Sequence, residues 1–215
     1  FALSLQQSNG AIAWNVDKLG IVDEDYLLTG CSSIAKSIEC SLAICEILNK
    51  SDFKFTLIDA HSNLLNAIEN PKGIFDLKKD RSRFSMDWYY PILSGANPKD
   101  NFARLLNKIS DIFWIPGVGI KCVADEPWVT VAETCECSIA FKKIGLEKNA
   151  QELLLNAAAI VDENSVPYMG WQLEEKIYWP EEQPSWTSGA LILAADANNA
   201  LTKAANLFLR KQFSS

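Results

Sequence analysis

Two acidic residues, Asp87 and Glu133, stand close to the starts of apolar segments that have helical spacing. A pair of carboxyl groups can act as general acid and general base when one holds a proton and the other is ionised. Such a pair cleaves glycosidic bonds when the two groups lie ~5 to 9.5 Å apart. We therefore predict Asp87 and Glu133 as catalytic residues. The alternatives are helix capping by Asp87 and pairing of Glu133 with a basic side chain.

Aromatic and polar side chains gather near the same segment starts. Trp and Tyr rings pack against the apolar faces of sugars, while charged groups bind sugar hydroxyls. The predicted ligand-binding residues are Trp88, Tyr89, Trp128, Trp171, Trp179, Trp186, Arg83 and Asp125. They indicate a small-molecule or oligosaccharide ligand. Core packing is the alternative for the tryptophans, a solvated loop for Arg83 and a helix-start charge for Asp125.

These segment starts recur along the chain. Hydroxylated residues, an aromatic or a carboxylate lead into an apolar run near residues 31, 87, 128 and 186. Each interval is long enough for one helix out and one helix back, which is typical of an array of helical hairpins. If alternate helices start at one end of the molecule, the predicted site residues converge on one mouth.

Apolar residues at a spacing of three to four predict the helices that position this mouth. Their predicted ranges are 32–48, 53–68, 87–95, 97–113, 127–144, 147–161 and 186–197. The last of them is apolar on every side, which favours a helix surrounded by protein. Residues 119–123 are the one predicted extended segment, and we expect almost no sheet elsewhere.

The predicted fold class is all-α, an α/α toroid, or barrel of helical hairpins, with about seven to eight helices. A closed ring of about six hairpins needs roughly 300 residues at the repeat length typical of such arrays. The chain has 215 residues. We therefore expect an incomplete ring, with residues 1–215 forming a single toroid domain or the C-terminal part of one.

Composition narrows the classes of partner. The chain carries 27 acidic and 20 basic residues, a net charge of -7, without a basic run interleaved with aromatics, so nucleic acid is excluded as a partner. Its longest apolar stretch is too short for a membrane span. A phosphate-binding glycine loop is absent, so no nucleotide cofactor is expected.

The cysteines and the one histidine are interpreted as structural. The six cysteines match no zinc or redox spacing. We predict buried free thiols, with disulfides and a metal site as alternatives, and no bound metal. This favours a reducing compartment and a cytoplasmic location. His61 is predicted to be partly buried and satisfied, with a catalytic base as the alternative.

Four segments carry a resemblance to a known family: LLTGCSSIAKSIECSLAI, RSRFSMDWYYPILSGA, PGVGIKCVADEPWVTVAETCE and WPEEQPSWTSGALILAADA. They resemble the C-terminal two-thirds of bacterial proteins labelled prenyltransferase, within the terpenoid cyclase and protein prenyltransferase superfamily of α/α toroids. The resemblance implies a toroid and an isoprenoid ligand. The Asp-rich motif of the cyclases is incomplete at Asp23-Glu24-Asp25-Tyr26, and His61 lacks the neighbours of a prenyltransferase zinc site.

Three functions follow from these patterns. The leading hypothesis is a carbohydrate-active enzyme or sugar-binding domain, of the glycosidase, lyase or epimerase kind. The alternative is an isoprenoid-handling protein in which the aromatics line an apolar pocket or stabilise a cation. The third is a non-catalytic helical repeat that binds another protein.

Overall fold

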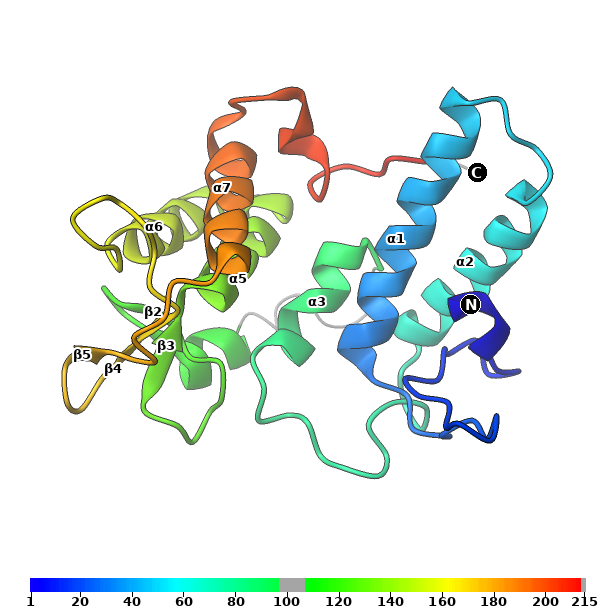
Figure 1. Ribbon diagram of the computed structural model, residues 1–215, viewed down its shortest axis with the longest axis horizontal. Helices are drawn as coiled ribbons and strands as arrows, with labels where there is room; N and C mark the ends of the chain where they lie inside the picture. Colours follow the sequence, from blue (N-terminus) through cyan, green and yellow to red (C-terminus); the bar gives the residue numbers. More distant parts are fainter. Residues whose placement is uncertain (97–106, 214–215) are drawn as a thin grey trace. The chain divides into compact units, whose positions relative to one another are not determined.

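Helices dominate the computed structural model, which describes residues 1–96 and 107–213 (Figure 1). The helices of four or more residues are η1 (Ala2–Leu5), α1 (Leu28–Ile47), α2 (Lys54–Glu69), α3 (Met86–Ser94), η2 (Ile109–Phe113), α5 (Val131–Lys143), α6 (Glu147–Ala158), α7 (Ser185–Asn199) and η3 (Lys203–Asn206). The strands are β1 (Trp114–Ile115), β2 (Gly119–Ile120), β3 (Trp128–Thr130), β4 (Gly170–Gln172) and β5 (Ile177–Tyr178). Within the described ranges, no helix has the length and apolarity needed to cross a membrane.

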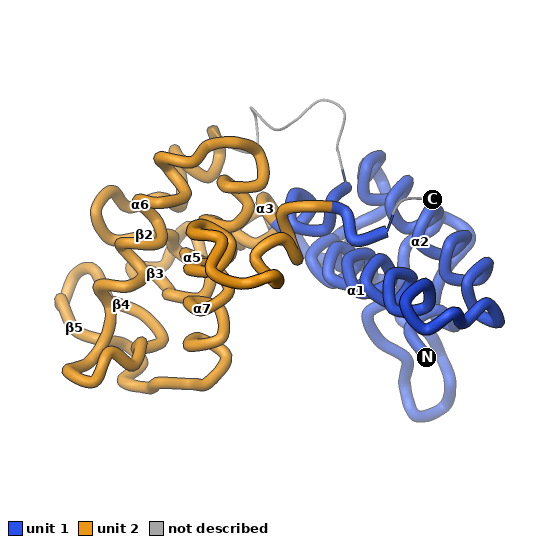
Figure 2. Tube along the Cα trace, turned by 90° about the horizontal axis from the view of Figure 1, so that it is seen from above, with its two compact units in different colours: residues 1–81, 90–101, 211–215 blue, residues 82–89, 102–210 orange. Residues whose placement is uncertain are grey.

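The chain divides into two compact units (Figure 2). Unit 1 comprises residues 1–81, 90–101 and 211–215, and unit 2 comprises residues 82–89 and 102–210. Unit 1 is therefore assembled from three separate stretches of sequence. The candidate catalytic residues both belong to unit 2.

A helical hairpin of α1 and α2 forms the centre of unit 1. Ile38 and Leu42 on α1 and Leu64 and Ile68 on α2 are buried, as their spacing of four residues on each helix predicts. The N-terminal segment lies against α2 at Gly10, whose φ is +86°. A Cβ on Gly10 would lie 2.4 Å from the Asn63 carbonyl oxygen, so only glycine permits this close approach.

Unit 1 also holds a half-buried carboxyl, Asp76, near Arg81. The Arg81 Nε lies 3.8 Å from the Asp76 Oδ1. Burial raises the pKa of Asp76 to about 6, and the Arg81 charge opposes this shift. The folded state therefore favours the protonated form of Asp76 more than the unfolded chain does.

This raised pKa gives unit 1 a defined pH dependence. A carboxyl whose pKa is higher in the folded state stabilises it fully below the unfolded value of 3.8, and this contribution is lost as pH rises through about 6. We expect Asp76→Asn to remove this part of the decline in the free energy of unfolding between pH 4 and pH 7. Urea denaturation of both proteins across this range measures it, and parallel pH profiles would contradict the assignment.

A second helical hairpin, of α5 and α6, forms the centre of unit 2. The two helices meet at Gly145, whose φ of +83° suits the left-handed turn that ends α5. Phe141 and Leu153 are buried on their facing sides, and the Ser138 hydroxyl donates to the Ala150 carbonyl at 2.6 Å. Helix α7 packs against α5. This packing sets the start of α5 within the core of unit 2.

Short strands lie next to the start of α5. Strand β3 runs directly into α5 and pairs with β4, which pairs with β5, all antiparallel. Strands β1 and β2 form a separate two-stranded hairpin. The extended segment expected at 119–123 is confirmed at its first two residues by β2. The all-α prediction is wrong to the extent of these two sheets, because the three-stranded sheet uses strands too short to give an alternating pattern.

Most predicted helices are present. The ranges 32–48, 53–68, 87–95, 147–161 and 186–197 match α1, α2, α3, α6 and α7. The range 127–144 is wrong in its first turn, since residues 128–130 are strand and α5 begins at Val131. Within 97–113, residues 97–106 lie outside the described residues, and 107–113 are helical.

The predicted burial of α7 is wrong on one side. Ile192 and Leu193 are 68% and 38% exposed, while Ala194 and Ala197 are buried. The packed face of this helix consists of Thr187, Ala194, Asp196 and Ala197, and larger apolar residues occupy the outward face. Apolar composition alone therefore does not indicate which face of α7 is covered.

Candidate active site

The candidate site lies in unit 2, where the start of α3, the loop after β2 and the start of α5 meet. The Ser85 backbone N–H donates to the Cys122 carbonyl at 3.0 Å. The Tyr89 hydroxyl donates to the Glu136 Oε2 at 2.9 Å. The first bond joins the start of α3 to the loop after β2, and the second joins α3 to α5.

Glu133 stands in the first turn of α5, where the helix dipole favours a negative charge. Its Oε2 is buried without a hydrogen bond from any residue in 1–96 or 107–213. The Cys122 thiol lies close enough to Glu133 for the two side chains to interact. Burial raises the pKa of Cys122 to about 12, with further contributions from the charge of Glu133, a side-chain hydrogen bond to Glu133 and the charge of Glu136. The carboxylates of α5 and the Cys122 thiol therefore form one cluster.

Asp87 occupies the first turn of α3 and is 8% exposed. It stands two residues before Tyr89, whose hydroxyl reaches α5. The structure thus places Asp87 and Glu133 in the same unit, at the starts of two helices that the Tyr89–Glu136 hydrogen bond joins. Their catalytic role stays a prediction.

Buried hydroxyls lie at the starts of three helices of unit 2. Ser85, Thr130 and Thr187 precede or open α3, α5 and α7, respectively. Each has a buried side-chain oxygen that no described residue hydrogen-bonds. A buried polar group without a partner costs about 1 to 3 kcal/mol, so a ligand or water that supplied partners here would stabilise the site.

Tyr89 and Glu136 differ from the sequence prediction. Tyr89 was expected to contact a ligand, but its side chain is 0% exposed and hydrogen-bonds Glu136. Glu136 and Cys122 were not identified from the sequence. The available signal was the spacing of Glu136, three residues after Glu133 and so on the same helix face. Cys122 had no such signal, because it reaches the cluster from a loop.

The Tyr89 hydrogen bond gives a direct stability prediction. Tyr89→Phe keeps the buried ring and removes one bond to a carboxylate, so we expect a loss of about 1 to 2 kcal/mol in the free energy of unfolding. Urea denaturation measures this. The matched control is Tyr168→Phe, which keeps the ring stacked 4.0 Å from Tyr178. Equal losses in the two variants would contradict a stabilising Tyr89–Glu136 bond.

Arg83 and Asp125, both predicted to bind a ligand, form an ion pair with each other, and their binding role stays a prediction. The Arg83 Nη2 and Nε lie 2.8 and 3.0 Å from the Asp125 Oδ1. Glu126 adds a second carboxylate 3.9 Å from Nη2. The Arg83 and Asp125 side chains are 44% and 66% exposed, so they form a surface ion pair at the edge of the loop that carries Cys122.

The predicted aromatic residues divide into two groups. Trp128 and Trp179 have ring centroids 4.8 Å apart. Trp171 lies 5.3 Å from Tyr178, in an edge contact. Trp171 is opposite Val129, one residue after Trp128 in the register of β3 and β4, so the two tryptophans project from opposite faces of the sheet. The sheet therefore separates the predicted ligand-binding aromatics.

The other two predicted tryptophans are placed differently. The Trp88 Nε1 donates to the Ser82 carbonyl at 2.9 Å, which secures the ring beside the loop before α3. Trp186 is 53% exposed at the start of α7, and Trp179 is 44% exposed. Trp179 and Trp186 are thus the predicted tryptophans with the most surface open to a ligand.

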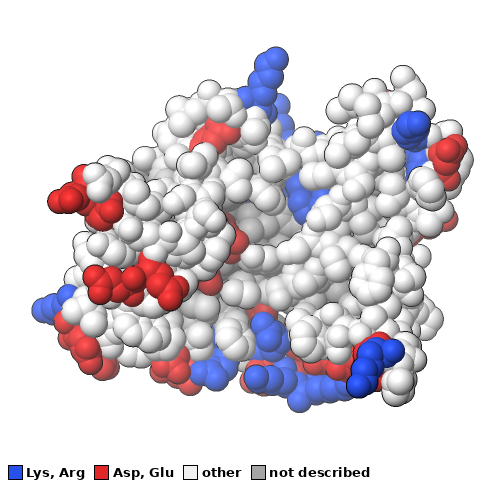
Figure 3. All heavy atoms as spheres, in the orientation of Figure 1, with Lys and Arg blue, Asp and Glu red and all other residues white. Residues whose placement is uncertain are grey.

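Acidic side chains surround the three-stranded sheet. Figure 3 shows Asp and Glu side chains over β4, β5 and the neighbouring loops. The exposed members are Glu163, Glu174, Glu175, Glu181 and Glu182. This charge repels polyanions, so the surface suits an uncharged ligand. Within the described residues, no group of three His, Cys, Asp or Glu side chains could hold a metal ion.

No protein-family model matches the chain. The chain is 37% identical over 209 residues to a protein named MMP endo-(1,4)-3-O-methyl-alpha-D-mannosidase from Mycolicibacterium hassiacum. The alignment covers 97% of this chain and 56% of that relative. The chain thus spans little more than half the length of the curated relative it matches.

This similarity corrects the family resemblance drawn from the sequence. The assignment to prenyltransferase-labelled proteins is wrong, because the matching relative is named as a glycosidase and no prenyltransferase family matches. The four segments that suggested the family contain helix starts with Trp, Ser and Asp, and these residue types serve sugar-binding and isoprenoid-binding folds alike. The incomplete Asp-rich motif agrees with the correction.

Proposed function

We propose that this chain is part of a carbohydrate-active enzyme that hydrolyses glycosidic bonds. The observation that carries the proposal is its similarity, over 209 residues, to a protein named as an endo-acting mannosidase. The carboxyls and buried hydroxyls at the helix starts of unit 2 also support it, because a pair of carboxyl groups can catalyse the cleavage of a glycosidic bond. The acidic, aromatic surface of the sheet is consistent with an uncharged ligand.

In the proposed mechanism Asp87 and Glu133 form the acid and base pair. One carboxyl protonates the glycosidic oxygen as the bond to the anomeric carbon breaks. The other activates the attacking water or stabilises the positive charge that develops on the sugar ring. Both residues stand in the first turn of a helix, and Ser85 and Thr130 supply hydroxyls for substrate hydrogen bonds.

The proposed substrate is an α-1,4-linked manno-oligosaccharide that carries 3-O-methyl groups, as the name of the relative describes for that protein. Methyl ethers replace hydroxyl donors with apolar surface, which increases the value of aromatic contacts. We assign these contacts to Trp179, its neighbour Trp128 and the exposed Trp186. Trp171, on the other face of the sheet, is assigned a structural role.

We also propose that the two helical hairpins are units of an α/α toroid, with residues 1–215 as one toroid domain or as the C-terminal part of one. The hairpins α1–α2 and α5–α6 support this, since each joins two packed helices through a short turn. An experimental structure with helices that do not alternate between an inner and an outer ring would contradict it.

Hydrolysis of defined oligosaccharides tests the proposed function. We expect the protein to release new reducing ends from 3-O-methylated α-1,4-manno-oligosaccharides. Matched α-1,4-gluco-oligosaccharides should react at least ten times more slowly, because they differ in the C2 configuration and lack the methyl groups. A ligand that binds only the folded state also raises the melting temperature. Neither hydrolysis nor a thermal shift with the methylated substrate would contradict the proposal.

A further inference from the structure

Aromatic side chains cluster on one face of the three-stranded sheet of unit 2. Trp171 and Tyr178 lie directly opposite each other in the register of β4 and β5, so their side chains project from the same face. Tyr168 stacks on Tyr178, with ring centroids 4.0 Å apart and ring planes inclined by 11°. Trp171 meets Tyr178 in an edge contact at 5.3 Å. We call Tyr168, Tyr178 and Trp171 the aromatic platform.

The platform is separate from the aromatic residues assigned to the active site. Side chains alternate between the two faces of a sheet along each strand. Trp128 is opposite Gln172, one position along from the pair of Val129 and Trp171, and its ring packs against Trp179. A ligand on the platform therefore leaves Trp128 and Trp179 available to a substrate.

The platform is accessible, and its backbone is fixed. Tyr178 is 36% exposed, and Tyr168 and Trp171 are partly exposed. The Tyr168 backbone N–H donates to the Ile160 carbonyl at 3.1 Å, and the pairing of β4 with β5 holds Tyr178 beside Trp171. The rings are thus ordered before a ligand arrives, so binding costs little side-chain entropy.

Carboxyl groups surround the Tyr168 ring. Desolvation raises the pKa of its hydroxyl, and the negative charges of Asp162, Glu181 and Glu163 raise it further. The hydroxyl therefore keeps its proton at neutral pH and can donate a hydrogen bond. The Asp162 Oδ1 accepts two backbone N–H groups of its own loop, whereas Glu163 and Glu181 are exposed. The edge of the platform thus offers a hydroxyl donor and carboxylate acceptors.

This geometry favours a neutral saccharide as the ligand. The surrounding carboxylates repel anions. A cation binds best where several ring faces point to one position. The rings of Tyr168 and Tyr178 are instead parallel and in contact, and Trp171 adds an edge contact. A sugar requires one flat aromatic surface with donors and acceptors beside it for its hydroxyls, and the platform has both.

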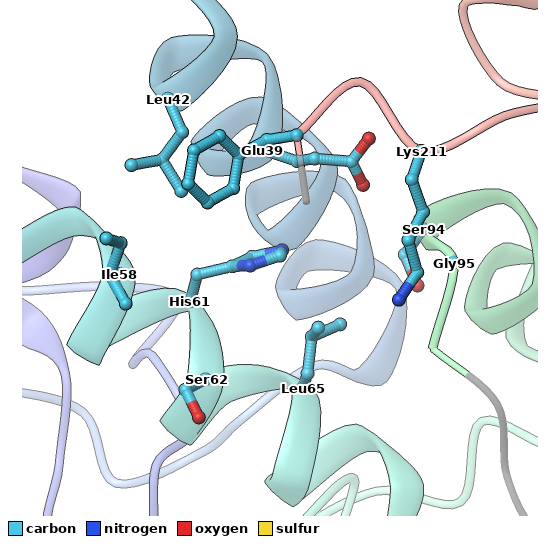
Figure 4. Close-up of a pocket in the computed structure, with 10 residues that line it drawn as sticks. Glu39, Leu42, Ile58, His61, Ser62, Leu65, Ser94, Gly95 and Lys211 are labelled. Carbon is cyan, nitrogen blue, oxygen red and sulfur yellow. The ribbon is translucent and has the colours of Figure 1, made fainter. Parts of the chain in front are cut away.

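The pocket of unit 1 lacks this combination. It has a volume of about 270 Å³, and side chains of α1 and α2 project into it (Figure 4). Glu39 is 3% exposed and accepts hydrogen bonds from the Lys36 side chain and the Gln212 backbone N–H. His61 is partly buried, as predicted, but its Nε2 is inaccessible and has no hydrogen bond from a described residue. The pocket therefore offers a sugar few accessible partners.

We propose that the aromatic platform is a surface site for a neutral saccharide chain, in which a sugar ring stacks on the exposed tyrosine rings and Glu163 and Glu181 accept hydrogen bonds from its hydroxyls. The assignment of the sugar as a 3-O-methylated mannose unit rests on the proposed function. The site holds a part of the chain outside the catalytic centre and takes no part in bond cleavage. A second contact with the same chain raises its effective concentration at the enzyme.

Tyrosine ring signals in NMR spectra report directly on the platform. The chain has five tyrosines, so Tyr168→Phe and Tyr178→Phe assign the two signals by their loss. The Glu133→Gln protein, labelled with ¹³C in its tyrosine rings, is titrated with a 3-O-methylated α-1,4-manno-oligosaccharide. We expect saturable shifts of the Tyr168 and Tyr178 signals. Saturable binding by calorimetry without a change in either signal would overturn the proposal, and so would the absence of binding by both methods.

Variants of Tyr178 test the stacking contact. We expect Tyr178→Ala to weaken the binding detected at the Tyr168 ring at least about fivefold, while Tyr178→Phe, which keeps the ring, stays within a factor of about two. The matched control is Phe55→Ala, which removes a 79% exposed ring from unit 1 and should leave binding unchanged. Unchanged binding in Tyr178→Ala with a native urea midpoint would overturn the proposal. If this variant does not fold, Tyr168→Ala, followed at the Tyr178 ring, makes the same test.

Tetramethylammonium chloride tests the cation alternative at the same rings. Because the two tyrosine rings are parallel, we expect no saturable shift of the Tyr168 and Tyr178 signals with this salt. A saturable response to tetramethylammonium without a response to the oligosaccharide would overturn the proposal and identify a cation site.

The two proposals can fail separately, because ring shifts measure binding without cleavage. A protein that hydrolyses the oligosaccharides but shows no response at Tyr168 and Tyr178 keeps the proposed function and loses the surface site. A protein that responds at both rings but does not hydrolyse the oligosaccharides keeps the surface site and loses the hydrolytic function.

Discussion

Glu133→Gln is expected to lower kcat for hydrolysis of the proposed substrate by about 10²- to 10⁴-fold, the usual contribution of a general acid or base. The change preserves the size of the side chain and removes its charge and proton. Because Glu133 Oε2 accepts no hydrogen bond from the described residues, the folded state should tolerate the amide. Steady-state kinetics and the urea midpoint, measured together, separate lost chemistry from lost folding. Asp87→Asn should show a loss of the same order.

The control for this experiment is Glu147→Gln. Glu147 also stands in the first turn of a helix of unit 2, α6, and its Oε1 lies 3.1 Å from the Lys142 Nζ. Its side chain is 71% exposed, so the substitution should leave kcat within a factor of two. If Glu133→Gln and Asp87→Asn both retain the kcat of this control, the assignment of the pair is wrong.

Gly119→Ala is expected to destabilise unit 2 by about 3 to 5 kcal/mol, from backbone strain and overpacking together. Gly119 has a φ of +147°, which residues with a side chain rarely adopt. A Cβ would lie 2.6 Å from the Thr134 Oγ1 and 3.2 Å from its Cγ2. Thr134 cannot rotate away without loss, because its hydroxyl donates to the Thr130 carbonyl and accepts the Ile120 N–H.

Gly117→Ala separates the two causes. Gly117 lies in the turn that precedes β2, with a φ of +74°, but its Cβ would meet no atom within 4 Å. This variant should lose only the strain energy, about 1 to 2 kcal/mol. Urea denaturation compares the two, and equal losses would show that Thr134 accommodates the extra carbon. We also expect Gly119→Ala to lower activity, since Thr134 adjoins Glu133 on α5.

The helices of both units could largely be predicted from the sequence. Each of α1, α2 and α6 buries one face, so its apolar residues recur every three to four positions over three or more turns. The apolar spacing was less informative where strand β3 runs directly into helix α5. Pro127 is well suited to the first turn of a helix, yet residues 128–130 pair with β4 and postpone the start of α5 to Val131.

The three-stranded sheet could not be predicted. Its strands have two or three residues each, which is too short for alternation to be seen. Strands β4 and β5 pair locally, but β3 and β4 pair residues that are 40 to 44 positions apart in sequence, for example Thr130 with Gly170 and Trp128 with Gln172. The two opposed faces of this sheet separate Trp128 from Trp171, a division that the sequence gives no means of detecting.

The helical members of the candidate site were proposed from the sequence and stay predictions, whereas its loop contacts were not identified. Glu133 and Asp87 were identifiable because helix starts are recognisable in sequence. Cys122 and the pairing of Arg83 with Asp125 depend on how a loop folds back on two helices. Such contacts are long-range, so no local pattern specifies them.

The position of Phe213 in the core of unit 1 has a consequence for how the protein is made. Residues 1–81 emerge from the ribosome before Phe213, so one wall of their apolar interior is supplied by a side chain synthesised more than 130 residues later. Unit 2, which is nearly continuous in sequence, can fold before Phe213 has been synthesised. Until Phe213 is available, the hairpin of α1 and α2 in the nascent chain has Leu42 and its neighbours incompletely covered. During this interval the hairpin is exposed to aggregation and to binding by chaperones.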